Sequence, residues 1–231
     1  MDKSIFRSAS AERRYLLRPL NSEQRQAAQL IRSCDVVFLT GPAGTAKTHV
    51  ALGTALELLG ERKFRGLVLT RPLVEAGEKT GFLPGKEAEK MRPWLEGFGD
   101  CLEQLTFENK DKFFEGVETP PLARLRGRTF TSRIAILDEA QNCTAVQLRL
   151  FLSRIGRGGK LVIAGDTSQC DLDGGGERLE QFAAALANVR VASDENSNGN
   201  GDGHRVGWER LTQCVRHPLI ETMLELTGSI R

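Results

Sequence analysis

The sequence lacks the features typical of membrane, secreted and zinc-binding proteins. No apolar run approaches the length of a membrane span. No C-x-x-C pair occurs, which argues against a zinc site and against a disulfide framework. Residues 1–19 mix acids and bases without a continuous apolar core, unlike a secretory signal. We therefore expect a cytoplasmic protein with no membrane partner. The cysteines are widely spaced, at Cys34, Cys101, Cys143, Cys170 and Cys214.

The chain also lacks a strong charge imbalance and any internal repeat. Its formal net charge of +2 neither indicates nor excludes a nucleic-acid partner, because a local basic face matters more than the total. A length of 231 residues suits one sizeable α/β domain and is short for two nucleotide-binding cores.

Apolar strand-like runs alternate with helix-like segments along most of the chain. This alternation predicts an α/β fold with a mostly parallel sheet and helices on both faces. We expect an N-terminal arm at 1–20, then a single domain at 21–231 that carries a helical insertion at about 73–129 and a flexible loop at about 193–204. The expected strands are 35–40, 65–72, 133–140 and 159–166, and the expected helices are 21–33, 49–59, 144–155 and 176–186.

The stretch "GPAGTAKTH", residues 41–49, follows one expected strand and opens the next helix. It fits the phosphate-loop pattern G-x-x-x-x-G-K-S/T, except that Ala46 replaces the second glycine. We expect Ala46 to begin a right-handed helical turn, where its methyl group is tolerated. The alternative is a plain glycine-rich turn. The expected nucleotide contacts are Gly41, Pro42, Ala43, Gly44, Thr45, Ala46, Lys47, Thr48 and His49.

Two further strands end in polar side chains that suit phosphate chemistry. Asp138 and Glu139 follow "IAIL", and Asp166 and Gln169 follow "LVIAG". An aspartate at such a place can hold the Mg²⁺ shell, and a glutamate can activate the attacking water. Gln169 could bind the γ-phosphate or that water. The alternatives are two acids in a solvated turn and a glutamine that caps the next turn.

Six segments together resemble the PhoH-like protein family: "GPAGTAKT", "LTRPLVEAGEKTGFLPG", "LARLRGRTF", "ILDEAQN", "FLSRIGRGGKLVIAGDTSQCDL" and "VRHPLIETMLEL". The resemblance implies a RecA-like P-loop NTPase core, similar to the first RecA-like domain of superfamily 1 helicases. It implies ATP, Mg²⁺ and RNA or other single-stranded nucleic acid as partners. Carried over to this chain, it makes Lys47 and Thr48 phosphate and metal ligands, Asp138 and Glu139 the Walker B pair, and Gln169 the γ-phosphate sensor.

The resemblance extends to two residues outside these motifs. Gln24 is similar to the glutamine with which such helicases read adenine, although an exposed helix-face amide is the alternative. Arg216 is the expected arginine finger, supplied to the neighbouring subunit of a closed homo-oligomeric ring, with a hexamer as one candidate size. A structural salt bridge is the alternative for Arg216.

Arginines gather just before the acidic strand and could hold a phosphate backbone. A solvated basic loop is the alternative. Arg71, after the second strand, is a weaker candidate for contact with a single strand. The clustered arginines are Arg124, Arg126, Arg128 and Arg133.

Three functions remain open at this point. The first is a Mg²⁺-dependent P-loop ATPase that remodels or unwinds nucleic acid, as an RNA helicase does. The second is a small-molecule kinase, and the third is a non-motor scaffold whose assembly ATP controls. The acid pair and Gln169 suit attack by water better than transfer to an acceptor.

Overall fold

The computed structural model describes residues 17–72, 98–103, 105, 117–168, 174–187, 189–191 and 204–215. Within them the chain forms a six-stranded sheet in the order β2-β3-β4-β1-β6-β5. Every neighbouring pair from β2 to β6 is parallel, and β5 is antiparallel to β6. The predicted α/β class with a mostly parallel sheet is confirmed. The strands are β1 Val36–Thr40, β2 Leu67–Thr70, β3 Ile134–Leu137, β4 Lys160–Gly165, β5 Arg190–Val191 and β6 His204–Arg210.

Helices connect these strands close to the places that the sequence pattern indicated. Asn21 caps the first helix by accepting a hydrogen bond from the Gln24 backbone N–H. Thr144 and Gln147 form a reciprocal capping box at the start of α5. The helices are α1 Ser22–Ser33, α2 Lys47–Gly60, α5 Ala145–Leu152 and α6 Gly175–Leu186, with short 3₁₀ turns η1 Leu122–Leu125 and η2 Ala140–Asn142.

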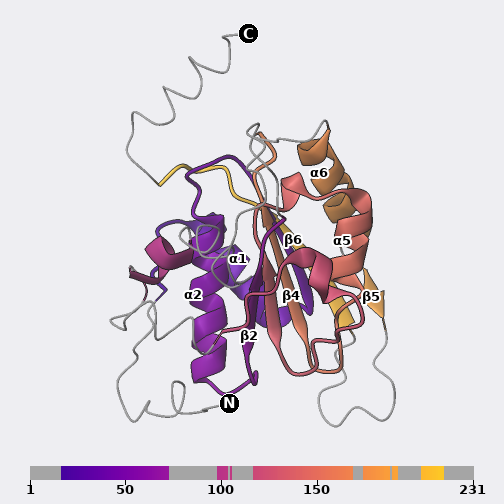
Figure 1. Ribbon diagram of the computed structural model, residues 1–231. Coiled ribbons are helices and arrows are strands. Elements are labelled where there is room, and N and C mark those ends of the chain that lie inside the picture. The colour runs from indigo at the N-terminus through magenta and orange to yellow at the C-terminus, as the bar shows by residue number, and fades with distance from the viewer. Residues whose placement is uncertain are drawn as a thin grey trace, which may run out of the picture.

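The sheet is covered on both faces, which explains why its inner strands read as continuous apolar runs. Val37 and Leu39 face α1 and α2 in one hydrophobic cluster, whereas Phe38 joins the cluster beneath α5 and α6. Figure 1 shows α1 and α2 on one side of the strands and α5 and α6 on the other. The alternation follows from the pleat, because successive side chains of a strand point to opposite faces.

The strand order determines which loops meet at the carboxyl edge of the sheet. Strand β4 lies between β1 and β3, with Thr40 of β1 beside Gly165 and Leu137 of β3 beside Ile163. The segments that follow β1, β3 and β4 therefore emerge side by side. These three segments carry the phosphate loop, the acid pair and Asp166.

Parts of the predicted insertion at 73–129 pack into the main core. Phe98, Leu102 and Leu105 join the cluster of α1 and α2, and Glu118 exchanges backbone hydrogen bonds with Leu67 and Leu69. Residues 1–16, the rest of the insertion and residues 192–203 lie outside the described residues, so the proposed arm, insertion and flexible loop stay predictions. Within the part of the chain that the structure describes, no helix is long and apolar enough to span a bilayer.

Candidate functional site

The phosphate loop joins β1 to α2, and at Gly41 its backbone leaves room only for glycine. Gly41 has a φ of 138°, and a Cβ there would lie 1.9 Å from the carbonyl oxygen of Leu211. Gly44 has a φ of 82°, also in the region that favours glycine. The loop is therefore closely supported by residues 211–215, and Val215 donates a backbone hydrogen bond of 3.0 Å to the Gly44 carbonyl.

Ala46 does not begin a right-handed turn, so that prediction is wrong. Its φ of 66° and ψ of 29° place it in the left-handed region, as the residue that precedes the first turn of α2. The chain leaves the loop and enters the helix at this residue, and an N-cap residue need not have helical dihedrals. Position 46 is thus one where glycine would be the less strained residue, because a left-handed conformation brings Cβ close to the following carbonyl oxygen.

We expect Ala46→Gly to stabilise the protein by about 0.5–1 kcal/mol. Relief of left-handed strain, about 1–2 kcal/mol, exceeds the entropy lost by a more flexible unfolded chain, about 0.4–1 kcal/mol. Urea unfolding would measure the change. Ala43→Gly is the matched control, since Ala43 is not among the positive-φ residues and should lose stability. A destabilised Ala46→Gly protein would show that position 46 is not left-handed.

Lys47 extends back over the loop that precedes it. Its ammonium donates hydrogen bonds of 2.7 Å to the carbonyls of both Gly41 and Pro42, and its side chain is buried. The Thr45 hydroxyl donates to the Pro42 carbonyl as well, at 3.0 Å. The lysine ammonium is therefore held against the phosphate loop, where its charge can stabilise bound phosphate oxygens.

Gln24 supports the loop from α1 and is not the exposed amide that the alternative interpretation required. It is 2% exposed. Its Nε2 donates to the Thr45 carbonyl at 3.3 Å, while its Oε1 accepts from the Leu20 backbone N–H at 2.8 Å. The side chain thus connects α1 with the phosphate loop. Its use in reading adenine stays a proposal.

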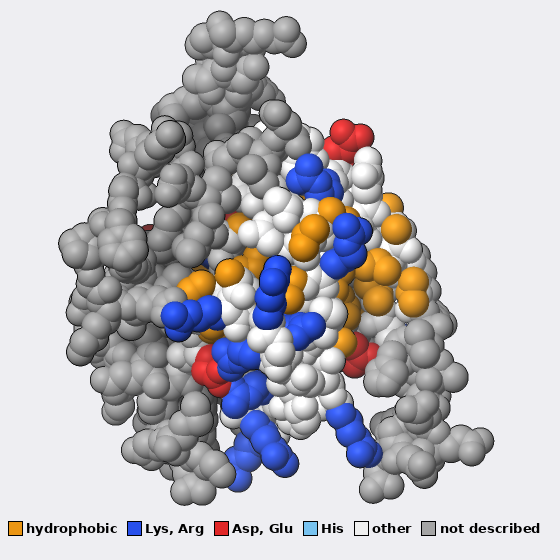
Figure 2. Space-filling model, turned by 45° about the vertical axis from the view of Figure 1, so that its right-hand side comes forward, with side chains coloured by type: hydrophobic (Ala, Val, Ile, Leu, Met, Phe, Trp, Pro, Cys, Tyr) orange, Lys and Arg blue, Asp and Glu red, His pale blue; other side chains and the backbone are white. Residues whose placement is uncertain are grey.

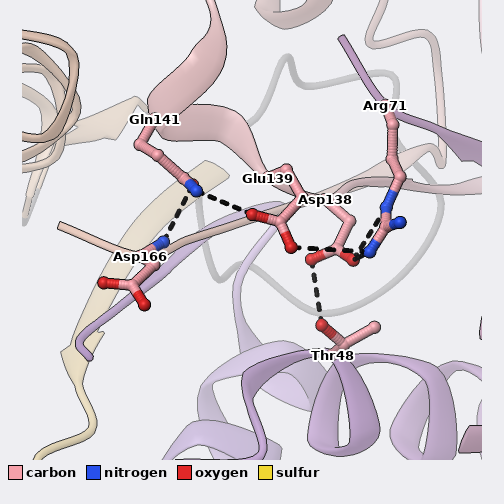
Figure 3. Close-up of polar contacts among 6 residues, drawn as sticks. All are labelled: Thr48, Arg71, Asp138, Glu139, Gln141 and Asp166. Carbon is pink, nitrogen blue, oxygen red and sulfur yellow. Dashed lines mark hydrogen bonds and ion pairs between the residues drawn. The ribbon is translucent and has the colours of Figure 1, made fainter. Parts of the chain in front are cut away.

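Thr48 and Asp138 meet across the site, 90 positions apart in sequence. The Thr48 hydroxyl donates a 2.9 Å hydrogen bond to Asp138 Oδ1, as Figure 3 shows. A hydroxyl and a carboxylate are the hard oxygen ligands that Mg²⁺ takes when substrate phosphates and water complete its octahedron. In the described parts of the chain, no group of three or more Asp, Glu, His or Cys side chains is placed so that it could hold a metal ion by itself. The donor set therefore fits Mg²⁺ bound together with a phosphate substrate.

Arg71 occupies the other side of Asp138. Its Nη2 lies 2.8 Å from Asp138 Oδ2 and 3.5 Å from Glu139 Oε1, and its Nε donates to Oδ2 at 3.2 Å (Figure 3). The guanidinium also lies 5.2 Å from the ring centroid of Phe98. The Arg71 side chain is only 17% exposed, which favours a role within the site over contact with a single strand. One oxygen of Asp138 is thereby left to Thr48 and a metal ion.

Glu139 lies beyond Asp138 in a strained backbone conformation, with a φ of 53°. Burial and the neighbouring Asp138 carboxylate raise its pKa above the ordinary value, although a hydrogen bond from Gln141 and the charges of Arg71 and Lys47 act in the opposite direction. A carboxylate with a raised pKa is a better proton acceptor near neutral pH. The local environment of Glu139 thus suits a general base.

Gln141 is a site residue that the sequence reasoning missed. Its Nε2 donates a 2.6 Å hydrogen bond to Glu139 Oε2, and its Oε1 accepts from the Asp166 backbone N–H at 2.8 Å (Figure 3). It therefore joins the ends of β3 and β4 and orients the glutamate. The available signal was a glutamine two positions after the acid pair, in "DEAQN".

Two of the predicted site residues cannot be compared with the structure, and His49 has a different charge state from one that would attract phosphate. Gln169 and Arg216 lie outside the described residues. Val215, which precedes Arg216, is bonded to the phosphate loop of its own chain. His49 is half-buried in the first turn of α2, and burial lowers its pKa, so it is neutral at neutral pH and adds no positive charge for phosphates.

Comparisons with known proteins point to one family. The family model described as PhoH-like protein matches residues 16–227. A PhoH-like protein of Synechocystis sp. is 38% identical over 222 residues, covering 94% of this chain and 64% of that protein. A PhoH-like protein of Bacillus subtilis is 38% identical, covering 87% and 61%. Protein PhoH of Escherichia coli K12 is 37% identical, covering 70% and 49%. The chain thus spans less than two thirds of the length of these relatives.

Solved structures that resemble the fold include helicases. The Pif1 helicase from Candida albicans aligns with a TM-score of 0.42 and 16% identity, covering 92% of this chain and 44% of that one. Bacteroides sp Pif1 in complex with ADP-AlF4 aligns with a TM-score of 0.37 and 16% identity, covering 90% and 45%.

Proposed function

This chain belongs to the PhoH-like protein family, and we propose from that premise that it is a Mg²⁺-dependent P-loop ATPase. We further propose that it couples hydrolysis to the binding, remodelling or unwinding of RNA or other single-stranded nucleic acid. In this proposal it works as a homo-oligomeric ring.

One observation carries the ATPase proposal: the hydrogen bond between Thr48 and Asp138. It joins the start of the helix after the phosphate loop to the acidic end of β3, and Glu139 follows directly. A plain glycine-rich turn has no need of a paired acid, and acids in a solvated turn would not be buried as Asp138 is, at 2% exposure. The pairing supports metal-assisted phosphate chemistry over both alternatives.

Each described residue has a separate task in this proposal. The loop backbone N–H groups and Lys47 bind the phosphates, and Thr48 and Asp138 hold Mg²⁺. When bound, Mg²⁺ neutralises charge on the phosphate oxygens. Glu139, oriented by Gln141, accepts the proton of the attacking water. The sensor role of Gln169 and the adenine contact of Gln24 belong to the same proposal.

Phosphate release from ATP tests the proposed activity directly. It should require Mg²⁺, stop with EDTA, proceed without an added acceptor and rise when single-stranded RNA or DNA is added. Release only in the presence of a small-molecule acceptor would identify a kinase instead. Nucleotide-dependent assembly by light scattering, with no phosphate release, would identify a scaffold.

If Arg216 is the arginine finger, its loss should slow the turnover of ATP without weakening the binding of ATP. We expect Arg216→Ala to bind ATP yet hydrolyse it about 10³–10⁵-fold more slowly, because the arginine neutralises charge that develops only in the transition state. Rapid-quench measurement of phosphate release and equilibrium titration of a fluorescent ATP analogue would separate the two effects.

A mixing experiment decides whether the arginine acts on the neighbouring subunit. Arg216→Ala subunits are combined with Glu139→Gln subunits, so that a mixed interface can pair an intact Glu139 with an intact Arg216. Partial recovery of phosphate release is expected. No recovery at any ratio, with mixed assembly confirmed by native mass, would contradict action across the interface. Val215 is bonded to Gly44 in the same chain, so action within one subunit is the alternative that this result would favour.

A further inference from the structure

Three segments far apart in sequence form one basic surface that begins at the amino edge of the sheet and continues along β2. Residues 61–66, 117–133 and 153–159 together hold nine Lys or Arg residues and two Glu residues, a formal net charge of +7. The whole chain carries only +2, so the remaining residues sum to −5. We call this surface the basic edge; its cations are Arg62, Lys63, Arg65, Arg124, Arg126, Arg128, Arg133, Arg154 and Arg157.

Backbone hydrogen bonds hold the three segments side by side. The Arg65 N–H donates to the Ser132 carbonyl at 2.7 Å, and the Ser132 N–H donates to the Arg157 carbonyl at 3.0 Å. Two successive inter-strand spacings place the backbones of Arg65 and Arg157 about 10 Å apart. That separation is about one Debye length at 0.1 M salt, so the charges act together on a nearby anion. Figure 2 shows Lys and Arg side chains gathered over the lower part of this face, with few acidic side chains among them.

Some of these cations stabilise the surface itself. Arg128 and Arg133 both pair with Glu118, and Lys63 pairs with Glu61 at 2.8 Å. Arg154 donates to the backbone carbonyls of Leu150 and Arg128, at 3.1 and 3.2 Å.

The other cations of the basic edge lie on the exposed surface. Arg62, Arg65, Arg124, Arg126 and Arg157 are all exposed. The exposed side chains of Arg62, Arg65 and Arg126 are therefore available to a bound partner.

The residues of the basic edge that directly precede β2, β3 and β4 lie at the opposite end of the strands from the candidate ATP site, because the phosphate loop, Asp138 and Asp166 follow β1, β3 and β4. Residues 118–120 continue the surface along β2, where the Thr70 hydroxyl donates to the Pro120 carbonyl. The five residue steps from Arg133 to Asp138 span about 16 Å along an extended strand. A partner at the basic edge can thus bind without entering the ATP site.

The chemistry of the surface favours a phosphate backbone over an acidic protein. Among the described residues the exposed large apolar side chains are Leu20, Val146 and Val189, and none belongs to the three segments. Protein interfaces are usually anchored by buried apolar or aromatic side chains, which this surface does not offer. Eight of its nine cations are arginines, which bind phosphate oxygens in a bidentate manner.

We propose that the basic edge is a nucleic-acid-binding surface that contacts the phosphate backbone without sequence preference, separate from the ATP edge. The proposal rests on the proposed nucleic-acid function and adds the place where the strand is held. Phosphate contacts position a nucleic acid and carry no sequence information by themselves. The surface would therefore retain a strand during cycles of ATP hydrolysis at the other edge.

The test compares two triple variants that remove the same charge. Arg62, Arg65 and Arg126 are changed to Gln in the basic-edge variant. Arg18, Arg25 and Arg210, which are also exposed, are changed to Gln in the control. Arg25 lies in α1 beside Gln24, and Arg210 ends β6, so the control samples the ATP edge. Binding of a fluorescent single-stranded 30-mer of RNA, and of DNA, is measured by anisotropy across a salt series.

We expect the basic-edge variant to bind about 10²-fold more weakly at 0.1 M salt, with the slope of log K against log salt about 2 smaller in magnitude, because about 0.7 is lost per phosphate contact with a single strand. Its melting temperature and its ATPase rate without nucleic acid should be unchanged. The control should keep the parent slope.

Each contrary result identifies what is wrong. Parent-like binding by the basic-edge variant, or greater loss in the control, would overturn the basic edge and leave the proposed nucleic-acid function standing. No binding by the parent protein at low salt would overturn both, while phosphate release could still support the ATPase. Equal competition by polyglutamate, at equal charge concentration, would identify a general polyanion surface and overturn the assignment to nucleic acid.

Discussion

Replacing Glu139 with glutamine is expected to preserve ATP and Mg²⁺ binding and to lower kcat by about 10²–10⁴-fold. Glutamine keeps the size of the side chain and an oxygen that can accept the 2.6 Å hydrogen bond from Gln141. It cannot accept a proton from water. Single-turnover phosphate release and ATP titration would be measured on the same preparation. Glu177→Gln, at an exposed position in the first turn of α6, is the matched control and should keep the parent rate.

The pH dependence of the parent enzyme adds a second readout for Glu139. Because its pKa is raised, the rate should fall on acidification at a pH above the ordinary glutamate value of 4.5. The effect on stability has the opposite sign. A carboxyl group whose pKa is higher in the folded than in the unfolded state favours folding more as pH falls through that interval. Activity should therefore decline on acidification while this group does not destabilise the fold. Hydrolysis by Glu139→Gln at the parent rate would show that Glu139 is not the general base.

Lys47→Ala is expected to abolish measurable hydrolysis and to weaken ATP binding at least tenfold. The lost ammonium is a buried charged donor, and a hydrogen bond to a charged group is worth about 1.5–3 kcal/mol. Loss of a donor that also stabilises transition-state charge costs about another 10²–10³ in rate. ATP affinity would be measured by calorimetry and turnover by phosphate release.

Lys47→Met separates the charge of the lysine from its packing. Methionine keeps most of the aliphatic stem but cannot donate to the carbonyls of Gly41 and Pro42. We expect it to fold more stably than Lys47→Ala and to be equally inactive. If Lys47→Met hydrolysed ATP at the parent rate, the ammonium would have no role in catalysis.

Much of the fold was predictable because its signals are local. The runs "DVVFLT" and "LVIAG" indicate buried strands by their length and continuous apolar character. Asn21 or Ser22 indicates the start of α1 by its capping chemistry, and the structure has Asn21 as the cap. Strand β5 was missed because it has two residues, too few for any periodic pattern. The sheet order was not predictable either, since apolar runs do not specify which strands are neighbours.

The candidate site was predictable where a motif carries its own chemistry and not where a side chain depends on a distant partner. Lys47, Thr48, Asp138 and Glu139 follow from their spacing, as the hydrogen bond between Thr48 and Asp138 supports. Arg71 was predicted only as a weak candidate for contact with a single strand, and its pairing with Asp138, 67 positions away, was missed.

The sequence by itself determined the chemistry of this protein: a lysine and a hydroxyl in a glycine loop, and an acid pair that ends an apolar strand. These motifs can be identified from residue type and short spacing alone, without knowledge of the fold. The tertiary structure alone decided the left-handed backbone of Ala46, the link from Glu139 through Gln141 to Asp166, and the basic edge. These features arise when parallel strands pack and bring the ends of several segments together, because burial of both faces of the sheet selects the neighbours.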